Sequence, residues 1–183
     1  PQLTFEVFRR VSPADGSGLE DLIEAITLIP GAGERTYDPV VVTRDLGGGV
    51  TFPENAFAGQ ADADWTVSLD DLQASLPNLK TVYLVIGWFG DDLRCGLCTL
   101  RPKVEVAAKT TTPFTWMVHG LARGSATTVS TIDGKPAYGG TPSDDAVVRA
   151  IRDLKARGID VVIYPFVFMD IAAGNSLPDP WTG

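Results

Sequence analysis

The chain of 183 residues has no excess of positive charge and no long apolar run. Its 15 Lys and Arg residues are outnumbered by 23 Asp and Glu residues, which gives a net charge of −8. A surface that neutralises nucleic-acid phosphates is therefore not expected. The longest apolar run, Val161–Met169, is far shorter than the ~20 residues of a membrane-spanning helix. Pro1–Val11 alternates and carries charges, which does not fit a signal peptide. We expect neither specific nucleic-acid binding nor a membrane-spanning segment.

Cysteine and histidine are also scarce. Two cysteines, Cys95 and Cys98, are too few for a disulfide scaffold, and the single histidine, His119, does not complete a closed zinc site of four ligands. Their CxxC spacing leaves open a local disulfide, a pair of structural thiols, redox chemistry or a metal, and we expect a disulfide or thiol pair. His119 follows an apolar, aromatic stretch and is expected to be a partly buried structural residue. We expect no cofactor and no metal.

The common catalytic motifs are missing as well. The sequence contains no GxSxG, HExxH, Walker A or GxGxxG motif, which argues against the commonest hydrolases, zinc proteases, nucleotide triphosphatases and dinucleotide-binding enzymes. The apolar fraction of 44% is ordinary for a folded protein. The sequence therefore predicts a folded chain whose function does not follow from these motifs.

Hydrophobic periodicity predicts both helices and strands. Gln2–Val11 alternates as a half-buried strand does, and Gly18–Thr27 has the period of a short amphipathic helix. Ser68–Leu76 is predicted to be a helix that ends before Pro77. The clearest helix begins after Ser143, an N-cap residue, and ends before Gly158.

Two nearly continuous apolar runs predict strands that are buried on both faces. Thr81–Gly87 and Asp160–Met169 each follow a helix, and this repeat is typical of a (β/α) barrel or an open parallel sheet. Pro165 lies inside the second run, where it indicates an edge strand or a bulge. Residues 101–138 have no helical period and are predicted to be a β-rich insertion. We expect an α/β fold with a partial, incomplete (β/α) TIM-barrel-like domain, because two units cannot close a barrel.

The candidate site lies at the carboxyl ends of the two apolar strands, where sites form in such folds. Trp88, Asp91 and Asp92 follow the first strand and Asp170 follows the second. Carboxylates at these positions could act as acid and base on a glycosidic bond, with Trp88 stacked on a sugar ring. The alternative is that the acids cap helices or face water. We treat the four residues as ligand-lining candidates, and no catalytic residue is assigned.

Several blocks in order resemble one known family, the large tail-tip (baseplate hub, "megatron") proteins of gene transfer agents and siphophages, which carry a TIM-barrel-like, glycoside-hydrolase-like domain. The blocks lie at residues 1–7, 25–31, 68–73, 76–77, 85–96 (VIGWFGDDLRCG), 138–144 (YGGTPSD), 164–166 and 174–180. The resemblance covers nearly the whole chain, although the family's proteins are far longer. It implies that residues 1–45 are the end of a short strand–helix, hub-associated segment. It also implies that residues 46–183 are the N-terminal part of the TIM-barrel-like domain.

The resemblance implies a structural component of a virion tail tip that takes part in host-envelope attachment and genome delivery. It implies a homotrimer, other tail or baseplate subunits as partners, host-envelope glycan as a ligand, and assembly in the bacterial cytoplasm. The family's glycosidase-like carboxylates are expected beyond Gly183, so this chain is not expected to be an enzyme by itself. One alternative is a glycoside hydrolase acting on cell-envelope glycans. A third hypothesis is a carbohydrate-binding module that uses Trp88 and Trp181 as platforms.

Overall fold

The structure is a computed structural model that describes residues 18–29, 33–58, 61–171 and 174–176. The predicted strand Gln2–Val11 and the candidate platform Trp181 lie outside the described residues. The helices are α1 (Leu19–Leu22), α2 (Asp64–Ser75) and α3 (Asp144–Ala156), and a 3-10 turn, η1, spans Arg123–Ser125. The longer strands are β1 (Ala25–Leu28), β2 (Thr43–Gly47), β3 (Val50–Pro53), β4 (Thr81–Gly90) and β13 (Asp160–Met169).

The principal sheet places β4 between β1 and β13, and both pairings are parallel. Thr81 is paired with Ala25 on one side and with Asp160 on the other, so the three strands begin at the same level. Both predicted apolar strands are present, but the predicted burial on both faces is wrong for β13, where Val162, Ile163, Tyr164, Phe166 and Val167 are 40–46% exposed. The strand at Thr81 is longer than predicted and runs to Gly90, whereas the strand at Asp160 has the predicted bounds.

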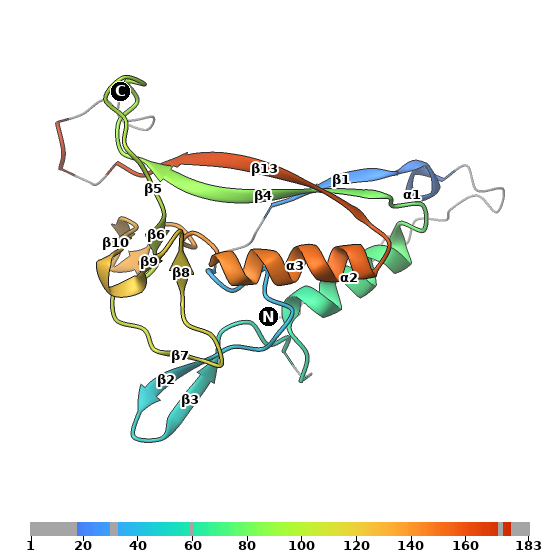
Figure 1. The fold of residues 1–183 in the computed structure, drawn as a ribbon, viewed down its shortest axis with the longest axis horizontal. Helices are drawn as coiled ribbons and strands as arrows, with labels where there is room; N and C mark the ends of the chain where they lie inside the picture. The colour runs from blue at the N-terminus through green and yellow to red at the C-terminus, as the bar shows by residue number, and fades with distance from the viewer. Residues whose placement is uncertain (1–17, 30–32, 59–60, 172–173, 177–183) are drawn as a thin grey trace, which may run out of the picture.

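Two helices cover one face of this sheet (Figure 1). Val82 and Leu84 of β4 point to this face, where they are completely buried with Trp65 and Leu69 of α2 and Leu154 of α3. Burying a large aliphatic or aromatic side chain contributes about 1.5–3 kcal/mol, so this cluster is a principal source of stability. Helix α3 confirms the helix predicted after Ser143, which accepts a hydrogen bond from the Ala146 N–H as the cap. Helix α2 confirms the helix predicted at 68–76, but it begins earlier than predicted, at Asp64.

Among the strands that the structure describes, β13 lies at the edge of the principal sheet, and this position explains Pro165. The Asp160 N–H donates to Lys80 O and the Asp170 N–H donates to Gly90 O, at 2.8 and 2.9 Å. The register between them has no shift, so the even-numbered residues of β13 direct their N–H groups toward β4. Pro165 is odd-numbered, and its missing N–H therefore falls on the free edge. The proline removes no bond of the β4 ladder, and it interrupts the edge that a further strand would pair with.

The chain between β4 and β13 is β-rich apart from α3. It forms eight two-residue strands, β5 (Leu100–Arg101), β6 (Lys103–Val104), β7 (Thr111–Thr112), β8 (Met117–Val118), β9 (Leu121–Ala122), β10 (Thr127–Thr128), β11 (Thr131–Ile132) and β12 (Lys135–Pro136). They pair locally, for example β8 with β9 and β11 with β12. A second core cluster of Val104, Trp116 and Val118 holds this segment together. We call residues 100–140 the insertion.

The expected TIM-barrel-like fold is wrong. The part of the chain that the structure describes is 34% strand and 21% helix, and its sheets mix parallel and antiparallel pairs. The helix–strand unit occurs twice, as α2–β4 and α3–β13, but short paired strands make up the rest. These strands contain Thr, Lys and Pro in stretches without a helical period, so they cannot supply the amphipathic helices that a barrel needs.

The predicted helix at Gly18–Thr27 is also largely wrong. The helix is limited to α1, and the chain then extends into β1. Ile26 and Thr27 are β-branched and lie opposite Val82 and Tyr83 of β4. Pairing with the central strand therefore outweighs the helical period of this segment.

Residues on both sides of the expected boundary at 45/46 pack together. The boundary falls within β2, which forms a hairpin with β3 and also pairs with β7 of the insertion. Tyr37 belongs to the same core cluster as α2 and α3. None of the described helices is long and apolar enough to cross a membrane.

Candidate functional site

The carboxyl ends of β4 and β13 lie side by side, because Gly90 is paired with Met169. The candidate residues that follow them have separate partners. Asp91 accepts a hydrogen bond from the Thr99 N–H at 2.7 Å. Asp92 accepts bonds from the backbone N–H and the guanidinium of Arg94, at 2.7–3.0 Å. These bonds hold the pKa of Asp92 below its ordinary value. Both acids thus stabilise the loop between β4 and β5.

Asp170 is buried and joins the end of β13 to the insertion. One oxygen lies 2.7 Å from Lys103 Nζ, and the carboxylate also accepts bonds from the N–H and hydroxyl of Ser130. The Asp170 side chain is fully buried and that of Lys103 is 14% exposed. A carboxylate with this many partners is a structural anchor, and it has no exposed oxygen for a substrate.

Trp88 is partly buried and packs against the second core cluster, which consists of Val104, Trp116 and Val118. Its ring is therefore part of the contact between β4 and the insertion. The structure brings the four candidates to one end of the sheet, as expected from strand topology, but each takes part in internal contacts.

His119 is not the partly buried residue that the sequence predicts. It lies exposed at the turn between β8 and β9 with a φ of 50°, and its N–H donates to Asp144 at 2.7 Å. Because Val118 is paired with Leu121, His119 lies in the turn of the hairpin. This position, and not the apolar stretch before it, determines that His119 is exposed. Among the described residues, no group of three or more His, Cys, Asp or Glu side chains is placed to hold a metal ion.

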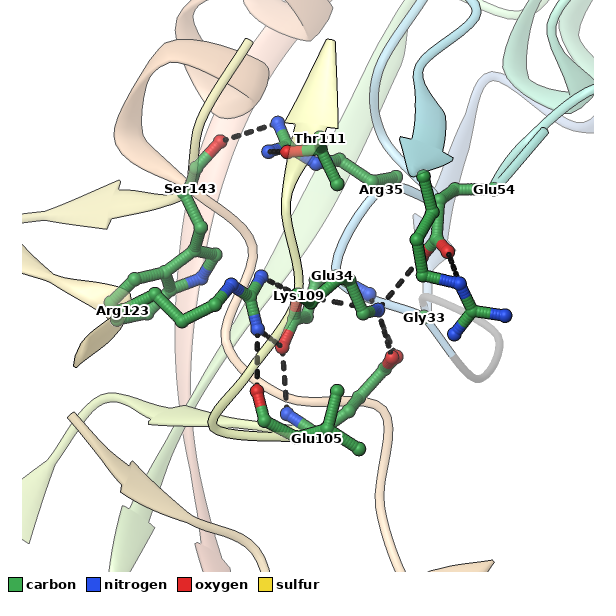
Figure 2. A network of polar contacts seen from close by, with 12 residues as sticks. Gly33, Glu34, Arg35, Glu54, Glu105, Lys109, Thr111, Arg123 and Ser143 are labelled. Carbon is green, nitrogen blue, oxygen red and sulfur yellow. Dashed lines mark hydrogen bonds and ion pairs between the residues drawn. The ribbon is translucent and has the colours of Figure 1, made fainter. Parts of the chain in front are cut away.

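A buried ionic network joins Glu34 to the insertion, and the sequence does not predict it (Figure 2). Glu34 is its centre. The Glu34 carboxylate accepts two bonds from the Arg123 guanidinium and a third from the Glu105 N–H at 2.6 Å. Lys109 Nζ lies 3.8 Å from it and donates to Glu54 and Glu105 at 2.7 and 2.8 Å. Burial lowers the pKa of Lys109, but the hydrogen bonds and charges of these carboxylates outweigh it, so that the pKa is raised.

A second group of charges adjoins the first. Arg35 donates to Thr111 and to Phe114 O at 3.1 and 3.0 Å, and lies 3.7 Å from Asp38. Asp38 in turn accepts two bonds from Arg149 of α3, at 2.9 and 2.6 Å. Burial lowers the pKa of Arg35. The two groups join residues 34–38, the insertion and α3.

The remaining surface feature is the face of the sheet opposite the helices. Side chains alternate along a strand, so Val162, Tyr164 and Phe166 point away from Val161, which packs on the helix side. Together with Thr27 and Tyr83 they form what we call the open face. A shallow depression lined by Thr27, Tyr83, Val162, Ile163 and Tyr164 lies on it. Tyr83, Tyr164 and Phe166 are 40%, 46% and 41% exposed.

No model of a known protein family matches the chain, and no curated protein matches it either.

Proposed function

We propose that this chain is a structural, protein-binding part of a phage or phage-like tail tip, built into the baseplate hub as a homotrimer. Two observations support the proposal. The first is the set of sequence blocks that resemble the tail-tip proteins, including the run from Val85 to Gly96. The second, which carries the argument, is the open face.

The middle of the open face is uncharged and largely apolar, and Asp160, on the same side of β13 by alternation, is exposed at the start of the strand. Parallel sheets in folded proteins are usually covered on both faces. In the described part of this chain, helices α2 and α3 lie on one face (Figure 1), and Tyr83, Val162, Tyr164 and Phe166 on the other face are 40–46% exposed. The helix-side residues Ile163 and Val167 of β13 are also 43% and 40% exposed, so this strand is incompletely covered on both faces. The members of the open face, Thr27, Tyr83, Val162, Tyr164 and Phe166, include no charged residue. A partner that complements this surface is another protein with an uncharged, apolar face, as a neighbouring hub subunit would provide.

Pro165 determines how that partner binds. Because the free edge of β13 lacks an N–H at its centre, addition of a further strand is disfavoured. The open face beside it has aromatic rings in contact, with Tyr164 and Phe166 at 6.4 Å between centroids. Buried aromatic residues are the usual anchors of protein interfaces. The partner therefore packs on the face and does not extend the sheet.

The glycoside hydrolase alternative has less support. It requires two carboxylates about 5–9.5 Å apart that are accessible to substrate. Asp170 is buried against Lys103 and Ser130, and Asp92 is paired with Arg94. Both acids have roles in stabilising the fold.

Incorporation of variants into particles tests the proposal. Phe166→Lys places a charge on the open face, and we expect incorporation of the full-length protein into purified particles to fall at least tenfold, about 1.4 kcal/mol. Leu46→Lys is the matched control, because Leu46 is an exposed apolar residue on the β2–β3 hairpin. We expect it to assemble like the wild type. Normal assembly of F166K, with correct folding verified by circular dichroism, would contradict the proposal.

A further inference from the structure

Two cysteines, Cys95 and Cys98, lie in the loop between β4 and β5. The inference drawn from them does not depend on the proposed function. Arg94 O accepts hydrogen bonds from the N–H groups of Leu97 and Cys98, at 2.8 and 3.1 Å. A carbonyl that receives both its i+3 and its i+4 N–H belongs to a turn of helix. Residues three apart in such a turn lie on one side, with about 5–6 Å between their Cβ atoms. Cys95 and Cys98 are therefore neighbours.

The two thiols differ in their surroundings. Cys95 is exposed, Cys98 is half-buried, and both are free. The Cys98 sulfur lies against the end of β4, where a Cβ atom added to Gly90 would be only 2.8 Å from it and 3.1 Å from the sulfur of Met169. One thiol is thus open to reagents from solution, while the other is held against the sheet behind it.

We propose that Cys95 and Cys98 form a dithiol site for thiol–disulfide exchange, with small-molecule disulfides as the substrate class. The Cys95 thiolate attacks a disulfide RSSR, and one RS⁻ leaves as the mixed disulfide forms. Cys98 then loses its proton and attacks the Cys95 sulfur, which releases the second RS⁻. The balance is two protein thiols and RSSR giving one protein disulfide and two RSH. The protein is oxidised and the small disulfide is reduced.

The geometry favours this chemistry over metal binding. A closed soft-metal site takes about four ligands, and the described residues place no third His, Cys, Asp or Glu side chain in a group with the two thiols. Disulfide closure needs only the two sulfurs, and its Cα separation of about 4.4–6.8 Å is compatible with one helical turn. The oxidised turn would hold the loop that Asp91 and Asp92 already stabilise.

Oxidised glutathione, followed by alkylation and mass spectrometry of the folded protein, tests the site. We expect the wild type to become two hydrogens lighter, without retained glutathione, and to lose both alkylation sites. The Cys98→Ser variant lacks the second thiol, so it should accumulate one glutathione at Cys95. The Cys95→Ser variant should react more slowly, because Cys98 is half-buried.

Three outcomes would overturn the proposal. They are a wild type that keeps glutathione on Cys95, one that still takes up two alkyl groups, and one that forms disulfide-linked dimers. Treatment of the oxidised wild type with dithiothreitol should restore both alkylation sites, and failure to do so would also count against a reversible site.

Discussion

Tyr37 joins the loop before β2 to two strands of the principal sheet. Its buried ring packs edge-on against Trp65. Its hydroxyl donates to Val85 O at 2.6 Å and lies 3.2 Å from Leu28 O. Burial raises the pKa of Tyr37 well above its ordinary value, because the ionised phenol would lose its contact with water. Ionisation of Tyr37 at high pH is therefore expected to destabilise the core.

Tyr37→Phe should lower the free energy of unfolding by about 1–2 kcal/mol near neutral pH, since buried carbonyls lose their donor. The folded state keeps the phenol protonated above pH ~10, where the unfolded chain ionises it. Wild-type stability should thus be complete below pH ~10 and fall as the pH rises further, and the variant should lack this component. Urea denaturation at about pH 7 and about pH 10.5 measures both effects. Tyr83→Phe, on the open face, serves as the control, and an equal alkaline loss in Y37F would contradict the assignment.

At the same scale, sequence reasoning found the candidate acids but not their roles. Asp91, Asp92 and Asp170 follow the predicted strands, and parallel strands bring their carboxyl ends together, so their location could be predicted. Their partners could not. Lys103 and Ser130 approach Asp170 from the insertion, and no period or motif in the sequence connects them to it.

The strands of the principal sheet show which elements could be predicted. The apolar runs at 81–87 and 160–169 predict strands, whereas the helical period of Gly18–Thr27 predicts a helix where β1 lies. Its four residues acquire their conformation from pairing with β4, a contact that is distant in the sequence. The eight strands of the insertion have only two residues each, and such strands carry too few residues to show a period.

Pro165 interrupts the free edge of β13 and is expected to limit pairing of this edge with another chain. Pro165→Val restores an N–H at the centre of the free edge and supplies a residue with a high preference for strands. We expect concentration-dependent self-association to increase while the fold is kept. Light scattering over a concentration series measures this. Pro136→Val on β12, an exposed strand of the insertion, is the matched control and should remain unchanged. If both variants behave like the wild type, Pro165 does not protect the edge.

At the scale of the whole molecule, the buried ionic network connects segments that are distant in the sequence. Glu34 contacts Glu105 and Arg123 of the insertion, and Asp38 contacts Arg149 of α3. Burying so many charges is costly unless every member is paired, so the removal of one member affects the others. The network thus makes the packing of the insertion dependent on residues 34–38.

Glu34→Gln should lower the free energy of unfolding by about 3–5 kcal/mol, because Arg123 and Lys109 lose a buried counter-charge. The double variant Glu34→Gln with Arg123→Met removes one of the unpaired charges, and it should recover part of the loss. Urea denaturation of the single and double variants measures the coupling. Strictly additive losses would show that the two residues do not stabilise one another.

The prediction of a partial TIM-barrel-like domain is wrong at this scale, because the two helix–strand units α2–β4 and α3–β13 do not determine how the rest of residues 46–183 folds. The lack of a helical period predicts the β-rich insertion between β4 and β13, but it does not predict how the short strands of the insertion pair. The ionic network was missed for a related reason. Its charges come from loops and short strands, where no helical or strand period marks a residue as buried.

The order of the strands in the principal sheet has a consequence for synthesis of the chain. The central strand has one neighbour that is made well before it and another that is made well after it, since Thr81 pairs with both Ala25 and Asp160. While a ribosome is still translating the insertion, β4 has no partner strand on the side of β13. The apolar side chains of Val82 and Leu84 are not yet covered by α3. Until Met169 has left the exit tunnel, the nascent chain therefore exposes apolar surface that favours aggregation.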